Sequence, residues 1–181
     1  MSIHPTPVLE HEPDSGRARL TVRRAIVFTD VVGSTAIAAT QGDQVLLDLL
    51  ECHDRLVALN ASAFHGHIVK GTGDGAMLCF EQASRAIATA IQIQRQALGA
   101  EIPLRIGIDF GPVVPCEHGD YRGLVTHVAS RLTDLARAGE VLVSERAARA
   151  GGLPGRTRPT RVRGLPARMR VRALAVTRSE I

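Results

Sequence analysis

Apolar residues along the chain follow two patterns, short continuous runs and stripes at helical spacing. The runs predict strands, because a strand covered on both faces reads as unbroken apolar sequence. The stripes predict amphipathic helices, in which apolar positions recur every three or four residues. We expect strands at about 20–31, 67–70, 76–80, 104–110, 141–143, 160–163 and 168–176. We expect helices at about 34–40, 43–65, 83–98, 124–138 and 144–149.

A glycine-rich turn at residues 71–75 separates two of the apolar runs. Its Asp-Gly pair is typical of a β-hairpin. The strand at 104–110 is expected to break at Gly111-Pro112, and residues 113–117 can continue it as a short arm. Strands and helices that alternate around a hairpin predict an α+β fold, an α/β sandwich whose central mixed or antiparallel sheet is flanked by helices. Residues 1–20 have no periodicity and three prolines, so they are expected to form a flexible tail before one folded domain at 21–178.

The bulk composition restricts the class of protein. Hydrophobic residues make up 45% of the 181 residues, yet no apolar run reaches the length of a membrane span, so we expect no membrane partner. The three cysteines are odd in number and have no paired metal spacing, which indicates packed thiols in a reducing compartment. These features favour a cytoplasmic protein.

The net charge of +4 comes from an arginine-rich segment, residues 156–172, which holds seven arginines. Nucleic-acid binding is disfavoured, because aromatic residues that would stack on bases are only 3% of the chain and tryptophan is absent. The alternation of arginines along 168–172 indicates the solvent face of a strand instead.

Lysine occurs only once among the 22 basic residues, at Lys70, four residues before Asp74. A lysine is a compact point charge and an arginine is a planar fork, so this exception is suggestive. Chance could also produce a single lysine.

The segment from Ala25 to Thr35 reads as a buried strand that ends in an acid, followed by a glycine turn and a helix start. Asp30 is costly to bury without a cation or donors. The helix start at Ser34 or Thr35, either of which can cap the helix, offers free N–H groups that attract phosphate. The pattern indicates a metal and phosphate site. Alternatively, Asp30 only caps the helix and Asp74 is only a turn residue.

Four motifs follow one another along residues 23–176 with defined spacing. They are FTDVVGST at 28–35, KGTGDG at 70–75, RIGI with Gly111 at 105–111, and GDYRG, ASRL and AGEVLVS between 119 and 144. In this order they resemble the catalytic domain of class III nucleotide cyclases, the adenylate and guanylate cyclase homology domain. The resemblance covers nearly the whole chain except the tail.

The resemblance assigns metal and phosphate roles to the first half of the site. Asp30 and Asp74, with the Val31 carbonyl, are implied to hold two Mg²⁺ or Mn²⁺ ions. Backbone N–H groups of Gly33, Ser34 and Thr35 are implied to bind the phosphates.

The same resemblance assigns substrate recognition and charge stabilisation to the other half. Lys70 and Asp120 occupy the purine-selecting positions, where a Lys donor and an Asp acceptor match adenine. Arg131 is the expected stabiliser of the transferring phosphoryl group. Arg163 lies roughly where a basic residue contacts the terminal phosphates, although it also reads as an exposed charge at a strand end.

His127 departs from the family pattern, which usually has Asn four residues before the arginine. Some bacterial members carry His there, and a neutral His can donate one hydrogen bond to the ribose. Because His127 and Arg131 are four residues apart on a predicted helix, they share a face. The alternative is that His127 only packs near Tyr121.

The resemblance implies a head-to-tail homodimer whose active sites combine metal residues of one chain with base-reading residues of the other. The expected function is an adenylate cyclase that converts ATP to 3′,5′-cyclic AMP and pyrophosphate. Two alternatives stay open: a cyclase with another base preference, and a nucleotide-binding or dimerisation module with little or no activity.

Overall fold

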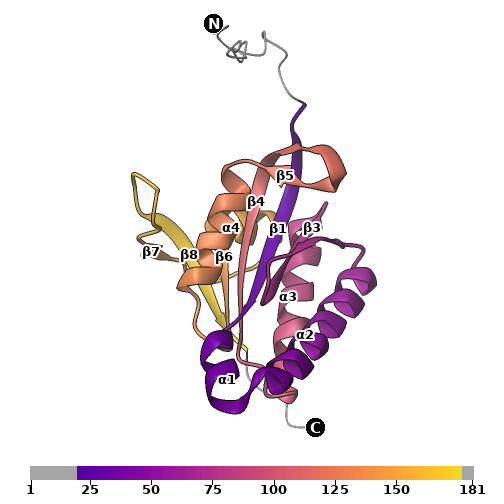
Figure 1. The fold of residues 1–181 in the computed structure, drawn as a ribbon. Helices are drawn as coiled ribbons and strands as arrows, with labels where there is room; N and C mark the ends of the chain where they lie inside the picture. The colour runs from indigo at the N-terminus through magenta and orange to yellow at the C-terminus, as the bar shows by residue number, and fades with distance from the viewer. Residues whose placement is uncertain (1–19, 177–181) are drawn as a thin grey trace, which may run out of the picture.

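The long strand β1 (Val22–Val31) lies near the middle of an eight-stranded sheet in the computed structural model, which describes residues 20–176 (Figure 1). The strand order is β2-β3-β1-β4-β6-β8-β7, with β5 paired to β4. Only β4 and β6 are parallel, so the sheet is mixed, as predicted. The other strands are β2 (His67–Gly71), β3 (Gly75–Phe80), β4 (Leu104–Pro115), β5 (Tyr121–Arg122), β6 (Glu140–Ser144), β7 (Arg158–Thr160) and β8 (Met169–Ala175).

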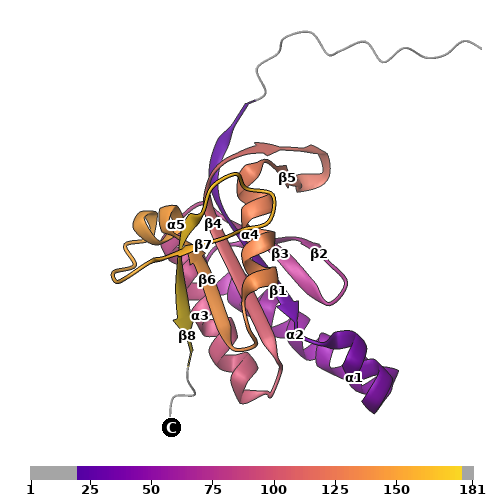
Figure 2. The same cartoon turned by 90° about the vertical axis from the view of Figure 1, so that its left-hand side faces the viewer.

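Helices cover both faces of this sheet (Figures 1 and 2). They are α1 (Ser34–Gln41), α2 (Asp43–Ala63), α3 (Ala83–Gly99), α4 (Leu124–Leu135) and α5 (Glu145–Ala150). Side chains of a strand alternate between faces, so Val27 packs in the core with α2 and α3 while Ile26 packs against α4. The continuous apolar run of β1 is therefore explained by two cores, one on each face.

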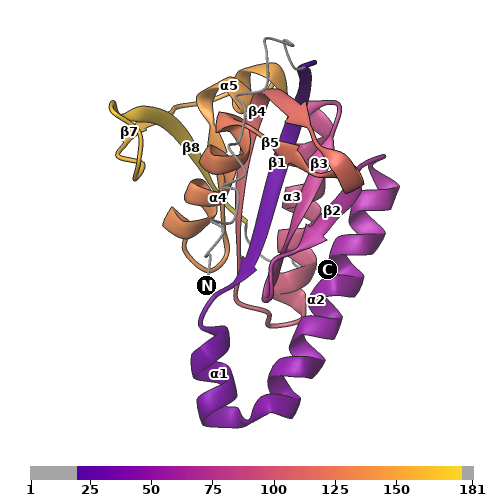
Figure 3. The same cartoon turned by 45° about the horizontal axis from the view of Figure 1, so that its top comes forward.

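At the start of the domain, α1 and the first turns of α2 project away from the sheet. Figure 3 shows α1 and the first turns of α2 extending beyond the strands, and none of the eight residues of α1 is buried. The turn between β1 and α1 is thus left at the surface. None of the helices between residues 20 and 176 is long and apolar enough to cross a membrane.

The predicted hairpin and all five predicted helices are confirmed, with ends that differ by a few residues. The predicted break at Gly111-Pro112 is wrong, because β4 continues to Pro115. Pro112 lies beyond the short stretch of β4 that pairs with β6, so its missing N–H costs little at this free edge.

Two predictions in the arginine-rich segment are also wrong. The strand predicted at 160–163 is found at 158–160, as β7. Val162 lies in the loop that follows and packs inward beside Leu165. Arg172 does not face solvent: it is 5% exposed, and its Nη1 donates to the carbonyl of Leu153 at 2.9 Å. The tail predicted for residues 1–20 lies outside the described residues, except for Leu20.

Candidate functional site

Two carboxylates come together where β1 ends and β3 begins. Asp30 is opposite Gly75 in the ladder, and the Val31 N–H donates to the backbone carbonyl of Asp74 at 3.0 Å. A Cβ atom at Gly75 would lie 1.9 Å from the carbonyl oxygen of Thr29. Only glycine therefore lets the two strands approach closely enough to place Asp74 beside Asp30.

Each carboxylate has a different partner, and this separates their pKa values. Arg105, which is opposite Asp30 on β4, places Nη2 2.6 Å from the Asp30 carboxylate. Burial and the nearby charge of Asp74 nevertheless raise the pKa of Asp30. Burial also acts to raise the pKa of Asp74, but the hydrogen bond from the Ser34 hydroxyl, at 2.5 Å, and the charge of Arg105 hold it below its ordinary value.

The glycine turn after β1 leaves the start of α1 without a side-chain cap. Gly33, which begins the helix, has φ of 76°, a left-handed conformation that favours glycine. The expected capping by Ser34 or Thr35 is therefore wrong, because the Ser34 hydroxyl goes to Asp74 instead. The alternative that Asp30 caps this helix is wrong as well, since Asp30 binds Arg105.

The donor set at this turn fits a divalent cation only in part. Between residues 20 and 176, three or more His, Cys, Asp or Glu side chains nowhere gather in a metal-binding arrangement. Asp30 and Asp74 supply two carboxylates, and the chain of β1 adds the Val31 carbonyl. Mg²⁺ accepts such incomplete sets, because it takes its remaining oxygen ligands from phosphates and water.

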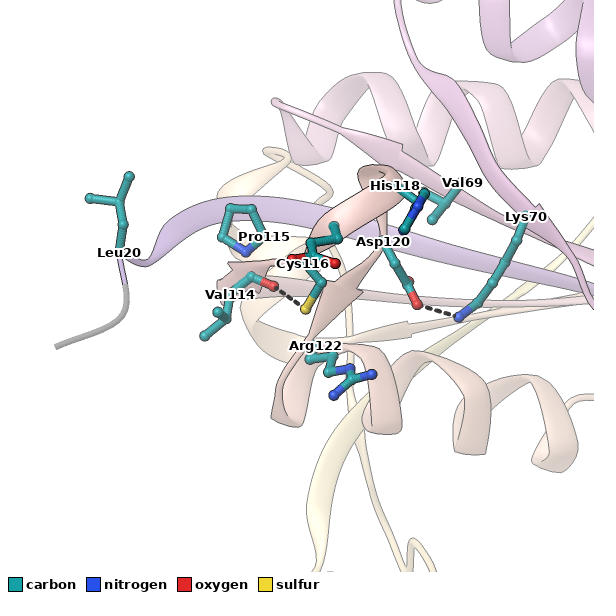
Figure 4. Close-up of a pocket in the computed structure, with 10 residues that line it drawn as sticks. Leu20, Val69, Lys70, Val114, Pro115, Cys116, His118, Asp120 and Arg122 are labelled. Carbon is teal, nitrogen blue, oxygen red and sulfur yellow. Dashed lines mark hydrogen bonds and ion pairs between the residues drawn. The ribbon is translucent and has the colours of Figure 1, made fainter. Parts of the chain in front are cut away.

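A second cluster lines the groove shown in Figure 4, which lies between the edge strand β2 and the segment from the end of β4 to β5. The Lys70 ammonium of β2 donates to the Asp120 carboxylate at 2.7 Å (Figure 4), and the side chains are 48% and 30% exposed. This hydrogen bond lowers the pKa of Asp120. The groove is about 970 Å³, and Val69, Cys116, His118 and Arg122 also line it.

A third cluster surrounds a hollow of about 300 Å³ beside α4. His127 and Arg131 line it from the helix, as their four-residue spacing predicts, and Arg163 lines it from the loop before β8. Arg163 is therefore not at a strand end. The ring beside Tyr121 is that of His67, with centroids 6.2 Å apart, whereas His127 is exposed.

Residues 20–158 match the family model described as the adenylate and guanylate cyclase catalytic domain. The chain belongs to this family. Among curated relatives, an adenylate cyclase of Streptomyces coelicolor is 33% identical over 67% of this chain but only 32% of its own length. The chain thus spans about a third of the length of the first curated relatives that it matches.

Solved structures of cyclases share the fold. A protein of Silicibacter pomeroyi titled adenylate/guanylate cyclase/hydrolase has a TM-score of 0.76 at 26% identity, covering 87% of this chain and 98% of its own. The adenylyl cyclase CyaB of P. aeruginosa has a TM-score of 0.75 at 22% identity, covering 90% and 98%. The predicted mixed sheet flanked by helices is therefore confirmed as a class III cyclase fold.

In the described part of this cyclase domain, the carboxylate cluster is linked to the third cluster but shares no polar contact with the Lys70–Asp120 pair. Across residues 20–176, no hydrogen bond or ion pair joins Asp30 or Asp74 to Lys70 or to Asp120. Asp134 provides the nearest connection to the third cluster, because its carboxylate pairs with Arg131 at 3.1 Å while its carbonyl accepts from Arg105.

Sequence reasoning gave no role to Arg105, although it stands inside one of the recognised motifs. Its importance follows from the β1–β4 register, which sets it opposite Asp30. That register joins residues 75 positions apart, so no local pattern could have revealed the ion pair.

Proposed function

We propose that this cyclase domain is an adenylate cyclase, which converts ATP to 3′,5′-cyclic AMP and pyrophosphate. The Lys70–Asp120 pair at the open groove carries the proposal. Separated by a base, the Lys donor and the Asp acceptor match the acceptor N1 and the donor amino group of adenine, whereas guanine presents the opposite pattern there. Both side chains are partly exposed, so an incoming base can replace their mutual contact.

The metal site of the proposed enzyme is formed by Asp30, Asp74 and the Val31 carbonyl. Two Mg²⁺ or Mn²⁺ ions, when bound, supply charge stabilisation for the ribose 3′-oxygen and for the departing pyrophosphate. Asp30 is then relieved of the nearby charge of Asp74 that raises its pKa.

The remaining residues bind and orient the triphosphate. Backbone N–H groups of Gly33, Ser34 and Thr35 face the phosphates at the helix start, where no side-chain cap competes. Arg131 stabilises charge on the α-phosphate as the 3′-oxygen attacks in line. His127 donates a hydrogen bond to the ribose, and Arg163 contacts the terminal phosphates.

We further propose that residues 21–178 act as a head-to-tail homodimer. The lack of any polar contact between the carboxylates and the Lys70–Asp120 pair, across residues 20–176, supports a site completed by a second copy. All three cysteines are free thiols, which supports a reducing, cytoplasmic location.

The test is an assay of purified protein with ATP or GTP and Mn²⁺, with detection of the cyclic product. Cyclic AMP formation that is lost in Asp30→Ala, while the dimer persists, supports the proposal. A confirmed dimer that forms no cyclic nucleotide from any triphosphate would contradict the enzymatic function.

Two alternatives have separate grounds, one a residue and the other the family. His127 replaces the usual Asn and favours a nucleotide-binding or dimerisation module with weak turnover. A cyclase of another base preference is the second alternative, because the family includes both adenylate and guanylate cyclases. Preference for GTP in the assay would exclude the role assigned to Lys70 and Asp120 and leave the rest of the site intact.

A further inference from the structure

A buried histidine outside the site is attached to the strand that carries Asp30. His53 of α2 is 1% exposed, and its Nε2 lies 3.0 Å from the Thr29 hydroxyl of β1. Its Nδ1 lies 2.9 Å from the carboxylate of Asp54, which is 75% exposed. Both ring nitrogens therefore have partners, as buried polar groups require.

The Thr29 hydroxyl connects this histidine to a second strand. Its oxygen accepts the backbone N–H of Ala76 on β3 at 3.0 Å, and Thr29 is opposite Ala76 in the ladder. Thr29 precedes Asp30 by one residue, and Ala76 follows Asp74 by two. The hydroxyl thus lies between the two strands at the point where each presents a carboxylate.

The hydrogen bonds are mutually consistent for a neutral imidazole. With the proton on Nδ1, the ring donates to Asp54, and Nε2 accepts the Thr29 O–H. The lone pairs of the Thr29 oxygen then remain free for the Ala76 N–H. Replacing the imidazole by an apolar side chain would leave the Thr29 hydroxyl with the Ala76 carbonyl, 3.5 Å away, as its remaining acceptor.

His53 acts on the face of the sheet opposite the carboxylates. Thr29 has the same strand parity as Val27 and Val31, which pack in the core of α2 and α3, whereas Asp30 has the other parity. His53 therefore touches neither substrate nor metal. Any effect it has on the site passes through the backbone of β1 and β3.

We propose that His53 is a positioning residue, which fixes β1 against β3 through Thr29 and so holds Asp30 and Asp74 at the separation that a divalent cation requires. The metal role of these carboxylates rests on the proposed function. The carboxylates have different partners, Arg105 and Ser34, and they repel each other, so the β1–β3 contact is what holds the two acids side by side. Residues that orient metal ligands from behind typically change metal affinity 10- to 100-fold when altered.

The experiment compares variants that keep or remove each hydrogen bond. His53→Gln keeps a polar group where Nε2 lies, and His53→Leu removes it. Thr29→Ser keeps the hydroxyl, while Thr29→Val removes it with little change of shape. His65→Asn, at an exposed position after α2 whose φ of 57° asparagine tolerates, is the control for loss of a histidine.

Mn²⁺ affinity is measured first without nucleotide, by electron paramagnetic resonance titration of the metal alone. We expect His53→Leu and Thr29→Val to weaken binding by about tenfold, with His53→Gln and Thr29→Ser close to the parent. Amide hydrogen exchange at Ala76 is expected to speed up in the same two variants. In the cyclase assay, His53→Leu and Thr29→Val should need a higher Mn²⁺ concentration for half-maximal rate. Their kcat should be largely restored at saturating metal.

The readouts separate this proposal from a merely structural role. Thr29→Val keeps the core volume. If its Mn²⁺ affinity and its rate of amide hydrogen exchange at Ala76 equal those of the parent, the proposal is wrong, even where His53→Leu unfolds. Parent protein that binds no Mn²⁺ also overturns it. Parent protein that binds Mn²⁺ without forming cyclic nucleotide contradicts the proposed function, yet an effect of Thr29→Val on Mn²⁺ binding would then still support the positioning role.

Discussion

At the scale of single residues, Asp30 and Asp74 show how one site places two acids in unequal environments. Burial and the charge of Asp74 raise the pKa of Asp30, while Ser34 and Arg105 help hold the pKa of Asp74 down. A raised pKa in the folded state means that ionised Asp30 opposes folding at neutral pH. A lowered pKa means that ionised Asp74 favours folding at the same pH.

Opposite effects on stability are therefore expected for two amide substitutions. At pH 7 without metal, Asp30→Asn should unfold at the parent's temperature or above it, because it removes a charge that opposes folding. Asp74→Asn should unfold below it. Both amides keep an acceptor for Arg105 or Ser34. Thermal unfolding monitored by circular dichroism checks this.

The pH dependence supplies the control. Asp74 contributes to the free energy of unfolding above its unfolded pKa of about 3.8, and this stabilisation is lost as pH falls through its lower folded pKa. The stabilisation from Asp30 is present below its unfolded pKa of about 3.8, and it is lost as pH rises through its higher folded pKa. The gain in unfolding temperature of Asp30→Asn should thus vanish in acid. If Asp30→Asn unfolds at a lower temperature than Asp74→Asn at pH 7, the opposite pKa shifts assigned to the two acids are contradicted.

Base selection is also a property of two residues. Lys70→Ala is expected to reduce the preference for ATP over GTP by about 10- to 100-fold, the effect of losing one charged hydrogen bond. Arg122→Ala, which removes another basic side chain of the same groove, is the control and should leave the ratio unchanged. The ratio of kcat/KM for the two nucleotides is the measurement; an unchanged ratio in Lys70→Ala would remove the argument for adenine.

At the scale of elements, the close approach of β1 and β3 creates the carboxylate pair. Gly75 permits it, since any Cβ atom there would overlap the backbone of Thr29. Gly71, at the other end of the same hairpin turn, has no atom within 4 Å of its Cβ position. The turn therefore contains two glycines with different structural requirements.

Substitution of these glycines by alanine should separate the two requirements. Gly75→Ala is expected to lower the free energy of unfolding by about 2–4 kcal/mol, because a strand must shift to relieve the overlap. Gly71→Ala should change it by about 0.5 kcal/mol or less. Urea unfolding measures both. Equal stability of the two variants would show that β1 and β3 can separate without cost.

At the scale of the whole molecule, the described residues of one chain contain no hydrogen bond or ion pair between the carboxylate cluster and the Lys70–Asp120 pair. A symmetric head-to-tail dimer brings different patches of two copies together twice. The proposed enzyme should therefore have two equivalent sites, each depending on both chains.

Mixing two inactive variants tests this arrangement. Asp30→Ala and Arg131→Ala are each expected to be inactive, but equal mixing with subunit exchange should restore roughly a quarter of the parent activity, because half of the dimers are mixed and each has one intact site. Unmixed samples, exchanged in the same way, are the control. No recovery from a mixture shown to contain mixed dimers would place the whole site within one chain.

Several features of this protein follow from local sequence. The Asp-Gly turn, the helical stripes and the buried β1 run predict their elements because backbone geometry and amphipathic spacing act over a few residues. The motif order also indicates the cyclase family. His127 and Arg131 share a face of α4 for the same local reason.

Other features depend on contacts between distant segments. The strand through Gly111-Pro112, the buried Arg172 and the inward Val162 differ from prediction because a free edge or a neighbouring loop determines their surroundings. No short-range pattern distinguishes these cases.

Sequence alone thus determined which chemical groups this protein has and on which elements they lie, because side-chain identity and backbone period are local properties. Tertiary structure alone decided which of them meet: Arg105 with Asp30, Ser34 with Asp74, and His53 with Thr29. The physical reason is that strand register pairs Arg105 with Asp30, while the packing of α1 and α2 brings Ser34 and His53 to the sheet. Both are set by packing over the whole domain, and they determine the neighbours and hence the electrostatics of the two acids.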